Sequence, residues 1–518
     1  MVGELPEGWA NASGPDLFRF IRGVTYAKGD VAEALQDGTI GILRANNIQD
    51  GHLNMEDLVY VPERCVSEEQ RLQVGDIVVA TSSGSLTVVG KAARVEEPLP
   101  GVSFGAFCCV LRPHDLALSD WICKFTQTRG YRRFIESKAA GININNLRAS
   151  HLESISLAIP PLREVQRTCS LLGQYRARQA NARAALEAIP PLLNRFRQSV
   201  LAAAFRGDLT ADWRAKNPDV EPASELLKRI RVERRRRWED AELQKMRAKG
   251  KVPGDDRWKA KYVEPQGVDA ESLPELPEGW VWATVGEVSE VEGGIQKQPS
   301  RRTGRDSFPF LRVANVFWGR LDLEEVHQIE LFDGELERLR LHEGDLLVVE
   351  GNGSPTEIGR MAIWDGRVEN CVHQNHLIRV RALGGLSPHF LSHFWSSPVG
   401  RQRVAREAQT TTGLYNLSKG KVSKLPVPVA PTAEQDALLA HLAPLLEFSR
   451  SMEGLSSSSP SRLTTLHQSL LAKAFRGELV PQDPDDESAS VLLERIRQER
   501  EAAGGDEKSR RGRKAKQS

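Results

Sequence analysis

The feature that most constrains the fold of this chain is an internal duplication with a period of about 270 residues. The pentapeptide LPEGW at 5–9 returns at 276–280, and QSVLAAAFRGDLT at 198–210 returns as QSLLAKAFRGELV at 468–480. Other pairs keep the same order along the chain: Leu43-Arg44 with Leu311-Arg312, Gly75-Asp76 with Gly344-Asp345, Gly90-Lys91 with Gly359-Arg360, Asn146-Leu147 with Asn416-Leu417, and 223–234 with 489–500. Because the order is kept and the offset hardly drifts, we infer two copies of one unit.

Each copy consists of a globule followed by helices. Short apolar runs bounded by Gly, Asp or Asn, such as 76–81 and 345–350, indicate buried strands, and 120–137 and 388–408 indicate helices. This mixture predicts an α/β globule with a mixed sheet in each copy. The predicted boundaries are 1–160 for the first globule, 161–209 for a central helical spacer, 210–274 for a basic helical linker, 275–430 for the second globule, 431–500 for a C-terminal helical spacer and 501–518 for a disordered basic tail.

The helical part of each copy carries the spacing of a coiled coil. Mostly apolar residues, with Gln179 and Ser449 among them, recur at steps of three and four from Val165 to Ile189 and from Leu438 to Met452. Because each seam is short, we expect the two helices to pair with each other. Antiparallel pairing would separate the tandem globules by long helices and give the chain pseudo-two-fold symmetry. Prolines and serines at 190–191 and 456–460 predict a break in each helix.

Charge and hydropathy limit the class of protein further. The chain has 70 basic and 69 acidic residues, and its net charge of +1 argues against binding nucleic acid by bulk attraction alone. A net charge near zero is still compatible with local basic faces on the folded protein. No run approaches the ~18 apolar residues of a membrane helix, and the first twenty residues lack the pattern of a signal peptide. We therefore expect a cytoplasmic protein that makes no membrane contact.

Motifs for catalysis or metal binding are missing from the sequence. The single Asn-Pro, at 217–218, lies in a polar linker and indicates a turn rather than part of an adenine methyltransferase motif. The glycine-rich segment 84–92 is one residue too long for a phosphate-binding loop and lacks the Ser or Thr that would hold magnesium. His389 and His393 are four residues apart, but Phe390 stands where a zinc protease has Glu. We expect no catalytic residue, no metal site and no cofactor on this chain.

Taken in order, these motifs resemble the specificity subunits of type I restriction–modification systems over roughly residues 3–500. The resembling set comprises LPEGW at the start of each globule, the Gly-Asp and Gly-Ser turns, Asn-Leu before a Pro-Pro or Ala-Pro junction, Glu164-Val-Gln166 and Glu434-Gln435 opening the helices, and QS(V/L)LAxAFRG(D/E)L closing them. The resemblance implies that each globule is a target-recognition domain reading one half of a bipartite site in double-stranded DNA. The paired helices would set the spacing between the halves.

The resemblance also implies partners that carry the chemistry. Two modification subunits, which bind S-adenosylmethionine and methylate adenine, would dock on the helices and domains of this chain. A restriction subunit that translocates and cleaves DNA with ATP and magnesium would join them. This chain departs from the family pattern in its long linker at 210–272, in the interrupted helices and in the irregular stretch 10–18.

Helix length is compatible with two DNA readers set about one turn apart. A helix over 162–188 would be about 40 Å long at ~1.5 Å per residue, and one turn of B-DNA is ~34 Å. The globules differ in their loops, so we expect an asymmetric target with unlike halves around a nonspecific gap.

Base recognition needs hydrogen-bonding side chains on exposed loops, and clusters of them occur in both globules. The predicted DNA contacts are Arg44, Asn46, Asn47, Ser83, Ser85, Asn143 and Asn145 in the first globule and Arg312, Asn315, Asn352, Ser354, Gln374, Asn375, Thr412 and Tyr415 in the second. We expect base reading at positions that differ between the copies, and examples are Asn143, Asn145, Gln374 and Tyr415. Asn47 and Asn146 recur as Asn315 and Asn416, which favours a role in turns or in positioning phosphates.

Three interpretations of the run Arg231–Arg237 stay open: a solvated helix face, a grip on DNA phosphates and a contact with an acidic partner. Two other functions are also weighed for the whole chain, an enzyme with its own active site and a scaffold whose coiled coil organises partners. Missing cofactor motifs argue against the enzyme. Binding at one discrete bipartite sequence would reject the scaffold.

Overall fold

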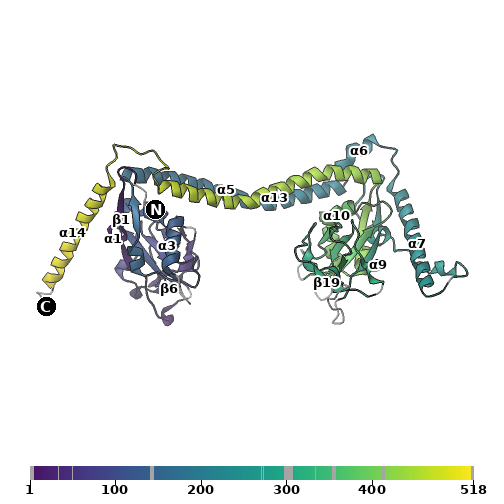
Figure 1. Ribbon diagram of the computed structural model, residues 1–518, viewed down its shortest axis with the longest axis horizontal. Helices are drawn as coiled ribbons and strands as arrows, with labels where there is room; N and C mark the ends of the chain where they lie inside the picture. The colour runs from purple at the N-terminus through teal and green to yellow at the C-terminus, as the bar shows by residue number, and fades with distance from the viewer. Residues whose placement is uncertain are drawn as a thin grey trace. The chain divides into compact units, whose positions relative to one another are not determined.

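Segments from both repeats combine in each of the two units of the computed structural model (Figure 1). Unit 1 contains residues 1–187 and 457–518, and unit 2 contains residues 188–456. The structure describes residues 5–32, 34–49, 51–139, 145–251, 253–269, 271, 273–296, 307–332, 334–352, 357–409 and 415–514, with the backbone alone for 352 and 503–514.

The first globule, in unit 1, contains a four-stranded and a three-stranded sheet. The four-stranded sheet has the antiparallel order β2-β11-β7-β9, and in the sheet β10-β3-β6 the strand β10 runs parallel to β3. Its strands are β1 (Ala10–Ser13), β2 (Phe18–Arg22), β3 (Thr39–Leu43), β4 (Ile48–Gln49), β5 (His52–Leu53), β6 (Val59–Pro62), β7 (Ile77–Ala80), β8 (Ser82–Ser83), β9 (Ala92–Arg94), β10 (Val102–Phe104), β11 (Cys108–Pro113), β12 (Asn145–Asn146) and β13 (Ser156–Ile159). Its helices are α1 (Gly14–Leu17), α2 (Ser119–Phe125), α3 (Arg129–Ala139) and α4 (Ala149–Glu153).

The second globule, in unit 2, repeats this topology strand for strand. Its sheets have the orders β15-β24-β20-β22 and β19-β16-β23, and the ladder β1-β13 returns as β14-β26. Its strands are β14 (Val281–Thr284), β15 (Ser289–Gly293), β16 (Ser307–Leu311), β17 (Val316–Phe317), β18 (Arg320–Leu321), β19 (His327–Glu330), β20 (Leu346–Val349), β21 (Gly351–Asn352), β22 (Met361–Ile363), β23 (Val372–His373), β24 (Leu377–Ala382), β25 (Tyr415–Asn416) and β26 (Pro426–Val429). Its helices are α8 (Val285–Val288), α9 (Glu335–Leu339), α10 (Pro388–Ser396), α11 (Pro398–Ala408) and α12 (Lys419–Lys424). The predicted duplication of a mixed α/β globule is therefore confirmed.

The Gly-Asp motif precedes a fully buried strand in both copies. Gly75 has a φ of +90° and Gly344 a φ of +91°, a left-handed conformation that favours glycine. The buried carboxylate of Asp76 accepts a hydrogen bond from the backbone N–H of Gln73 at 2.9 Å. The motif therefore turns the chain sharply into β7 and β20, whose side chains are all buried.

The segments 120–137 and 388–408, each expected as one helix, contain two. In the second globule Ser397 separates α10 from α11, and its hydroxyl accepts a hydrogen bond from the N–H of Gly400 at 3.1 Å. In the first globule Thr128 separates α2 from α3 and accepts in the same way from Tyr131 at 3.1 Å. A side-chain cap of this kind begins a new helix. The spacing of the apolar residues continues across the cap, which is why each segment was expected to be one helix.

The long helices α5 (Leu162–Phe205) and α13 (Thr432–Ala474) run through the sites where the sequence predicts breaks. Pro190 and Pro191 lie inside α5, and Pro460 lies inside α13. The predicted breaks were therefore wrong. A proline removes one backbone donor at a cost of about 3 kcal/mol, and packing of the helical segments within each unit outweighs that cost.

The two long helices pair antiparallel within each unit, as predicted. In unit 1, Leu172 of α5 packs with Leu471 of α13, and the side chain of Gln179 donates to the carbonyl of Leu463 at 3.2 Å. In unit 2, Phe196 and Phe448 lie edge to face at 6.2 Å between ring centroids. The Arg197 guanidinium there donates to Ser449 at 3.1 Å and to Glu453 at 3.0 Å.

The repeated motifs of one copy are completed by motifs of the other. In unit 1, Trp121 of the first globule packs on Phe475 of the second copy, with 4.2 Å between ring centroids. In unit 2, Phe205 of the first copy packs against Phe390 of the second globule at 5.2 Å. Because the motifs have nearly the same spacing in both copies, the end of each long helix packs on the globule of the other copy.

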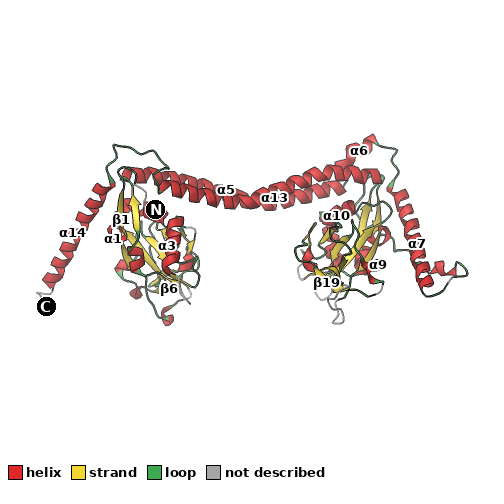
Figure 2. Cartoon of the chain, viewed as in Figure 1, coloured by secondary structure: helices red, strands yellow, loops and turns green. Residues whose placement is uncertain are grey.

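Two further helices pack on the globules through their N-terminal parts. Helix α7 (Ala223–Ala248) follows the short helix α6 (Ala211–Lys216) (Figure 2). At the start of α7, the N–H of Ala223 donates to the carbonyl of Gly279 at 2.8 Å. Helix α14 (Ala489–Lys514) begins in the equivalent way, with the N–H of Ala489 donating to the carbonyl of Gly8 at 2.9 Å. Helix α14 continues to residue 514, past residue 501, where the sequence indicated a disordered tail.

None of the helices in the described ranges has an apolar stretch long enough to cross a bilayer.

Candidate nucleic-acid interface

Two of the predicted clusters in the first globule meet in the short ladder between β8 and β12. Ser83 lies directly opposite Asn145, whose side chain donates to the carbonyl of Gly84 at 3.3 Å. Ser85 follows in the same turn, and its N–H donates to the Ser83 hydroxyl at 3.2 Å. The fold therefore brings together three side chains that the sequence analysis selected from distant segments.

The same ladder recurs in the second globule with different side chains. Asn352 of β21 lies opposite Tyr415 of β25. Beside the ladder of the first globule, the carbonyl of Phe107 accepts from the N–H of Thr81 at 2.8 Å, and the equivalent bond in the second joins His376 and Glu350 at 3.0 Å. The ring of Phe107 is 65% exposed, so an exposed aromatic residue in one copy corresponds to a histidine in the other.

Asn47 and Asn315 hold the loops on which their neighbours lie. Both are almost fully buried. The Asn47 amide oxygen accepts from the N–H of Arg44 at 2.8 Å, and its nitrogen donates to the carbonyls of Asn54 and Glu56 at 3.0 and 2.7 Å. Asn315 makes the equivalent three bonds with Arg312, Asp322 and Glu325. These bonds use both amide hydrogens, so the two side chains organise the loop instead of facing a base.

Arg44 and Arg312 also make contacts within their own loops. The Arg44 guanidinium donates to the carboxylate of Asp57 at 2.7 Å, and Arg312 lies 3.3 Å from Glu325. Asn46 is exposed, and its amide nitrogen lies 3.4 Å from the Asp57 carboxylate. Of these predicted residues, Asn46 presents the most accessible side chain.

The other predicted residues divide into described and undescribed positions. Gln374 and Asn375 form the turn between β23 and β24, where their N–H groups donate to Leu311 and Ile295 at 2.9 Å each. Asn143, Ser354 and Thr412 lie outside the described residues.

A hollow in unit 1 joins two of the predicted clusters. Asn46 and Gln49 line it on one side and Ser83 and Lys91 on the other, and its volume is about 450 Å³. A second cleft of about 480 Å³ shares Lys91 and lies between the globule and the paired helices. Its lining includes four cationic or titratable side chains besides Lys91: His52, Arg176, Arg183 and His467. This combination suits a polyanion that passes over the hairpin β4–β5.

Cations gather at the equivalent place in unit 2, on aromatic rings. The Arg401 guanidinium lies 4.1 Å from the ring centroid of Trp318, and Arg320 lies 4.6 Å from that of Phe317. Burial lowers the pKa of Arg401, and the nearby Arg197 lowers it further, whereas Glu357 opposes the shift. Arg401 and Arg320 thus place two guanidinium groups beside these rings, although the net charge of the whole chain is only +1.

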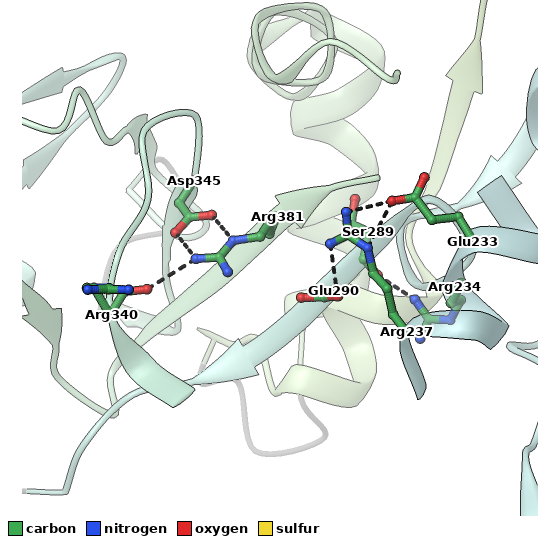
Figure 3. A network of polar contacts seen from close by, with 8 residues as sticks. All are labelled: Glu233, Arg234, Arg237, Ser289, Glu290, Arg340, Asp345 and Arg381. Atoms are coloured by element: carbon green, nitrogen blue, oxygen red, sulfur yellow. Dashed lines mark hydrogen bonds and ion pairs between the residues drawn. The ribbon is translucent and has the colours of Figure 1, made fainter. Parts of the chain in front are cut away.

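The arginine run of α7 fastens that helix to the second globule (Figure 3). Arg234 donates to the carbonyl of Ser289 at 2.7 Å, and Arg237 contacts both Glu233 at 2.6 Å and Glu290 at 3.4 Å. Arg231 donates to the buried Glu287 at 2.6 Å. These contacts pack α7 on the second globule, a role that none of the three interpretations of this run included.

Sequence reasoning did not select several residues at this interface. Gln49 and Phe317 follow the Arg-x-x-Asn motif by two positions, and Phe107 lies directly before β11. Lys91 and Arg360 are the second residues of the repeated pairs Gly90-Lys91 and Gly359-Arg360. The signal that identifies them is their equivalence between the copies, which becomes readable once the strands are aligned.

The fold defines a class of protein with two tandem α/β globules and two long paired helices, and the comparisons with known proteins agree. The chain is 33% identical over 519 residues to the EcoKI specificity subunit of Escherichia coli K12, covering 98% of this chain and 99% of the relative. It is 31% identical over 521 residues to the StySPI specificity subunit of Salmonella potsdam, with the same coverage. No family model matches the sequence.

Solved structures show the same fold. The HsdS subunit from Thermoanaerobacter tengcongensis aligns with a TM-score of 0.53 at 15% identity, over 92% of this chain and 99% of that one. A chain from a structural study of assembly and conformational transition of a type I restriction–modification system aligns with a TM-score of 0.59 at 16% identity, over 92% of this chain and 100% of the other. The chain belongs to the specificity subunits of type I restriction enzymes.

Proposed function

We propose that this chain is the DNA-reading subunit of its complex and that each globule recognises one half of an asymmetric bipartite site. The observation that carries the proposal is the pair of equivalent ladders with unlike side chains, Ser83 opposite Asn145 and Asn352 opposite Tyr415. Equal backbones present different hydrogen-bonding groups, which is what reading two different half-sites requires.

The paired helices separate the two readers and set the gap between the half-sites. We propose that they also dock two methyltransferase subunits. Exposed apolar side chains on the helix pair support a protein contact there: Leu466 in unit 1 and Phe448 in unit 2 are 53% and 57% exposed. In unit 1, Tyr175, Leu463 and Leu470 line an apolar groove beside Leu466.

The chemistry belongs to the partners in this proposal. The chain has no catalytic role of its own, and S-adenosylmethionine, ATP and magnesium bind to the modification and restriction subunits. The partner enzymes would be an adenine N6-methyltransferase and an ATP-dependent translocase-nuclease, and the assembly would be cytoplasmic.

Methylome sequencing of cells with and without this gene tests the proposal. We expect one bipartite motif with unlike halves to be methylated only when the gene is present. An unchanged methylome would contradict the DNA-reading role. Methylation by the purified chain alone would support instead an enzyme with its own active site, and a methylome without a discrete motif would support a scaffold.

A further inference from the structure

We propose that the hairpins β4–β5 and β17–β18 determine the base specificity of the two globules, with Gln49 and His52 reading one half-site and Phe317 and Arg320 the other. The inference rests on the proposed DNA-reading function. It goes beyond that function because it assigns base reading to four side chains that lie outside the predicted clusters.

In the first globule, the hairpin has one buried and one exposed face. Ile48 and Leu53 pair across it and pack into the core beside β7 and β9, with Ile48 1% exposed. Gln49 and His52 form the other pair, and both are exposed. The alternation of side chains along a strand thus points one residue of each strand into the core and the other outward.

The exposed face of this hairpin lies between the two hollows of unit 1. Gln49 lines the hollow that contains Asn46 and Ser83, and His52 lines the cleft that contains Arg176 and Arg183. Lys91 lines both hollows. A DNA strand lying across the hairpin would therefore have cations for its phosphates on one side and hydrogen-bonding side chains for its bases on the other.

The hairpin of the second globule has the same construction and a different chemistry. Val316 and Leu321 pair and are 0% and 9% exposed, whereas Phe317 and Arg320 pair on the exposed face. The Phe317 ring is 40% exposed, with the guanidinium groups of Arg320 and Arg360 at 4.6 and 5.9 Å from its centroid. An exposed ring flanked by two cations suits stacking or wedging at a base step beside phosphates.

Comparison of the two copies separates positioning from reading. The buried pair is apolar in both hairpins, and the cation beside the hairpin recurs as Lys91 and Arg360. Only the exposed pair changes, from Gln49 and His52 to Phe317 and Arg320. Phosphate contacts position a protein on DNA and carry no sequence information, whereas base contacts specify. Glutamine matches adenine and arginine matches guanine in the major groove, so the first hairpin should favour adenine and the second guanine.

Methylome sequencing of cells that carry the intact complex tests the assignment. Gln49→Ala and His52→Ala should relax one half of the motif, and Phe317→Ala and Arg320→Ala the other. Each change should lower the preference for the specified base by about tenfold. Lys91→Ala and Arg360→Ala should keep the methylated motif but weaken binding of the purified complex to DNA of any sequence. Each change should also reduce the slope of the logarithm of the binding constant against the logarithm of the salt concentration by about one, as expected for the loss of one phosphate contact.

Matched controls lie in the same globule as the second hairpin. Phe332 is 48% exposed, and the exposed Arg367 pairs with Asp365 on the surface. Phe332→Ala and Arg367→Ala should leave both half-sites unchanged. Thermal unfolding of each variant complex identifies any variant that loses the fold, and such a variant is replaced by the conservative change Gln49→Glu or Arg320→Lys at the same hairpin.

An exchange variant gives a readout that misfolding cannot imitate. Gln49→Phe combined with His52→Arg places the second hairpin's exposed pair on the first, and we expect a new base preference in the first half-site only. The assignment is overturned if folded hairpin variants, including this exchange, keep both half-sites at wild-type preference. A wild-type methylome that does not depend on this gene is a different result, because it contradicts the proposed function itself.

Discussion

The guanidinium of Arg381 forms two parallel hydrogen bonds with the carboxylate of Asp345, each 2.7 Å long (Figure 3). Arg112 and Asp76 make the same pair in the first globule at 2.8 and 2.7 Å. Both aspartate side chains are only 1% exposed. The pair joins the start of a central strand, β20 or β7, to the neighbouring strand, β24 or β11, so each Gly-Asp motif is clamped at the same point of the sheet.

Replacing Asp345 with Ala should destabilise unit 2 strongly. Removal of one partner leaves the Arg381 charge partly buried without its carboxylate, which typically costs about 3–5 kcal/mol. Urea unfolding monitored by tryptophan fluorescence measures the loss. Asp365→Ala breaks the exposed pair with Arg367 and should cost less than about 1 kcal/mol. Equal losses for the two variants would show that the buried pair contributes no more than a surface pair.

Acidification should destabilise unit 2 through His373. Burial and the neighbouring Arg379 lower the pKa of this fully buried imidazole to about 3, from an ordinary value of 6.5. Between these two pH values the unfolded chain binds a proton that the folded chain does not, so stability falls as the pH decreases from about 6.5 towards 3. Thermal unfolding at a series of pH values measures this slope.

The duplication supplies the variant that tests this mechanism. Phe104 pairs with Leu43 in the first globule as His373 pairs with Leu311 in the second. His373→Phe should therefore fit the core, stabilise the protein by about 1 kcal/mol at neutral pH because a buried polar group is removed, and flatten the pH dependence. A variant that retains the full acid sensitivity would assign the slope to other groups.

Gly207 should not tolerate a side chain. Its φ is +80°, and an added Cβ would lie 2.3 Å from Cγ of Pro277 in the LPEGW turn of the second copy. Gly207→Ala should lower the free energy of unfolding by more than the roughly 1 kcal/mol expected from the backbone conformation alone. Gly250 has a φ of +67° with open space around it, so Gly250→Ala isolates the conformational cost. Similar losses for the two variants would exclude a tight contact between the repeated motifs.

Shortening both long helices should shorten the gap in the DNA target. Deletion of the facing segments 178–184 of α5 and 458–464 of α13 removes about 10 Å at ~1.5 Å per residue, equivalent to about 3 base pairs. Methylome sequencing reports the gap directly. A deletion of equal length at 241–247 in α7 should leave it unchanged, and an unaltered gap in the helix variant would contradict the spacing role of the helices.

The sequence alone determined the repeat and much of the local structure. The period of about 270 residues predicted two equivalent globules, and the strands of the two copies correspond one to one. Seam residues predicted the antiparallel helix pair, and the recurrence of Asn47 as Asn315 predicted their role in a turn. These features are encoded by residues close together in the chain, whose spacing and turn chemistry are readable without the fold.

Apart from the pairing of the two long helices, only the tertiary structure decided which distant segments meet. Helix α5 continues through Pro190 and Pro191 because its packing outweighs the local cost of the two prolines. Phe475 of the second copy completes the core of the first globule, and Gln49 and Phe317 occupy equivalent exposed positions on hairpins whose partners are buried. Contacts between residues hundreds of positions apart depend on how the whole unit folds. The spacing of neighbouring residues in the sequence therefore does not predict these contacts.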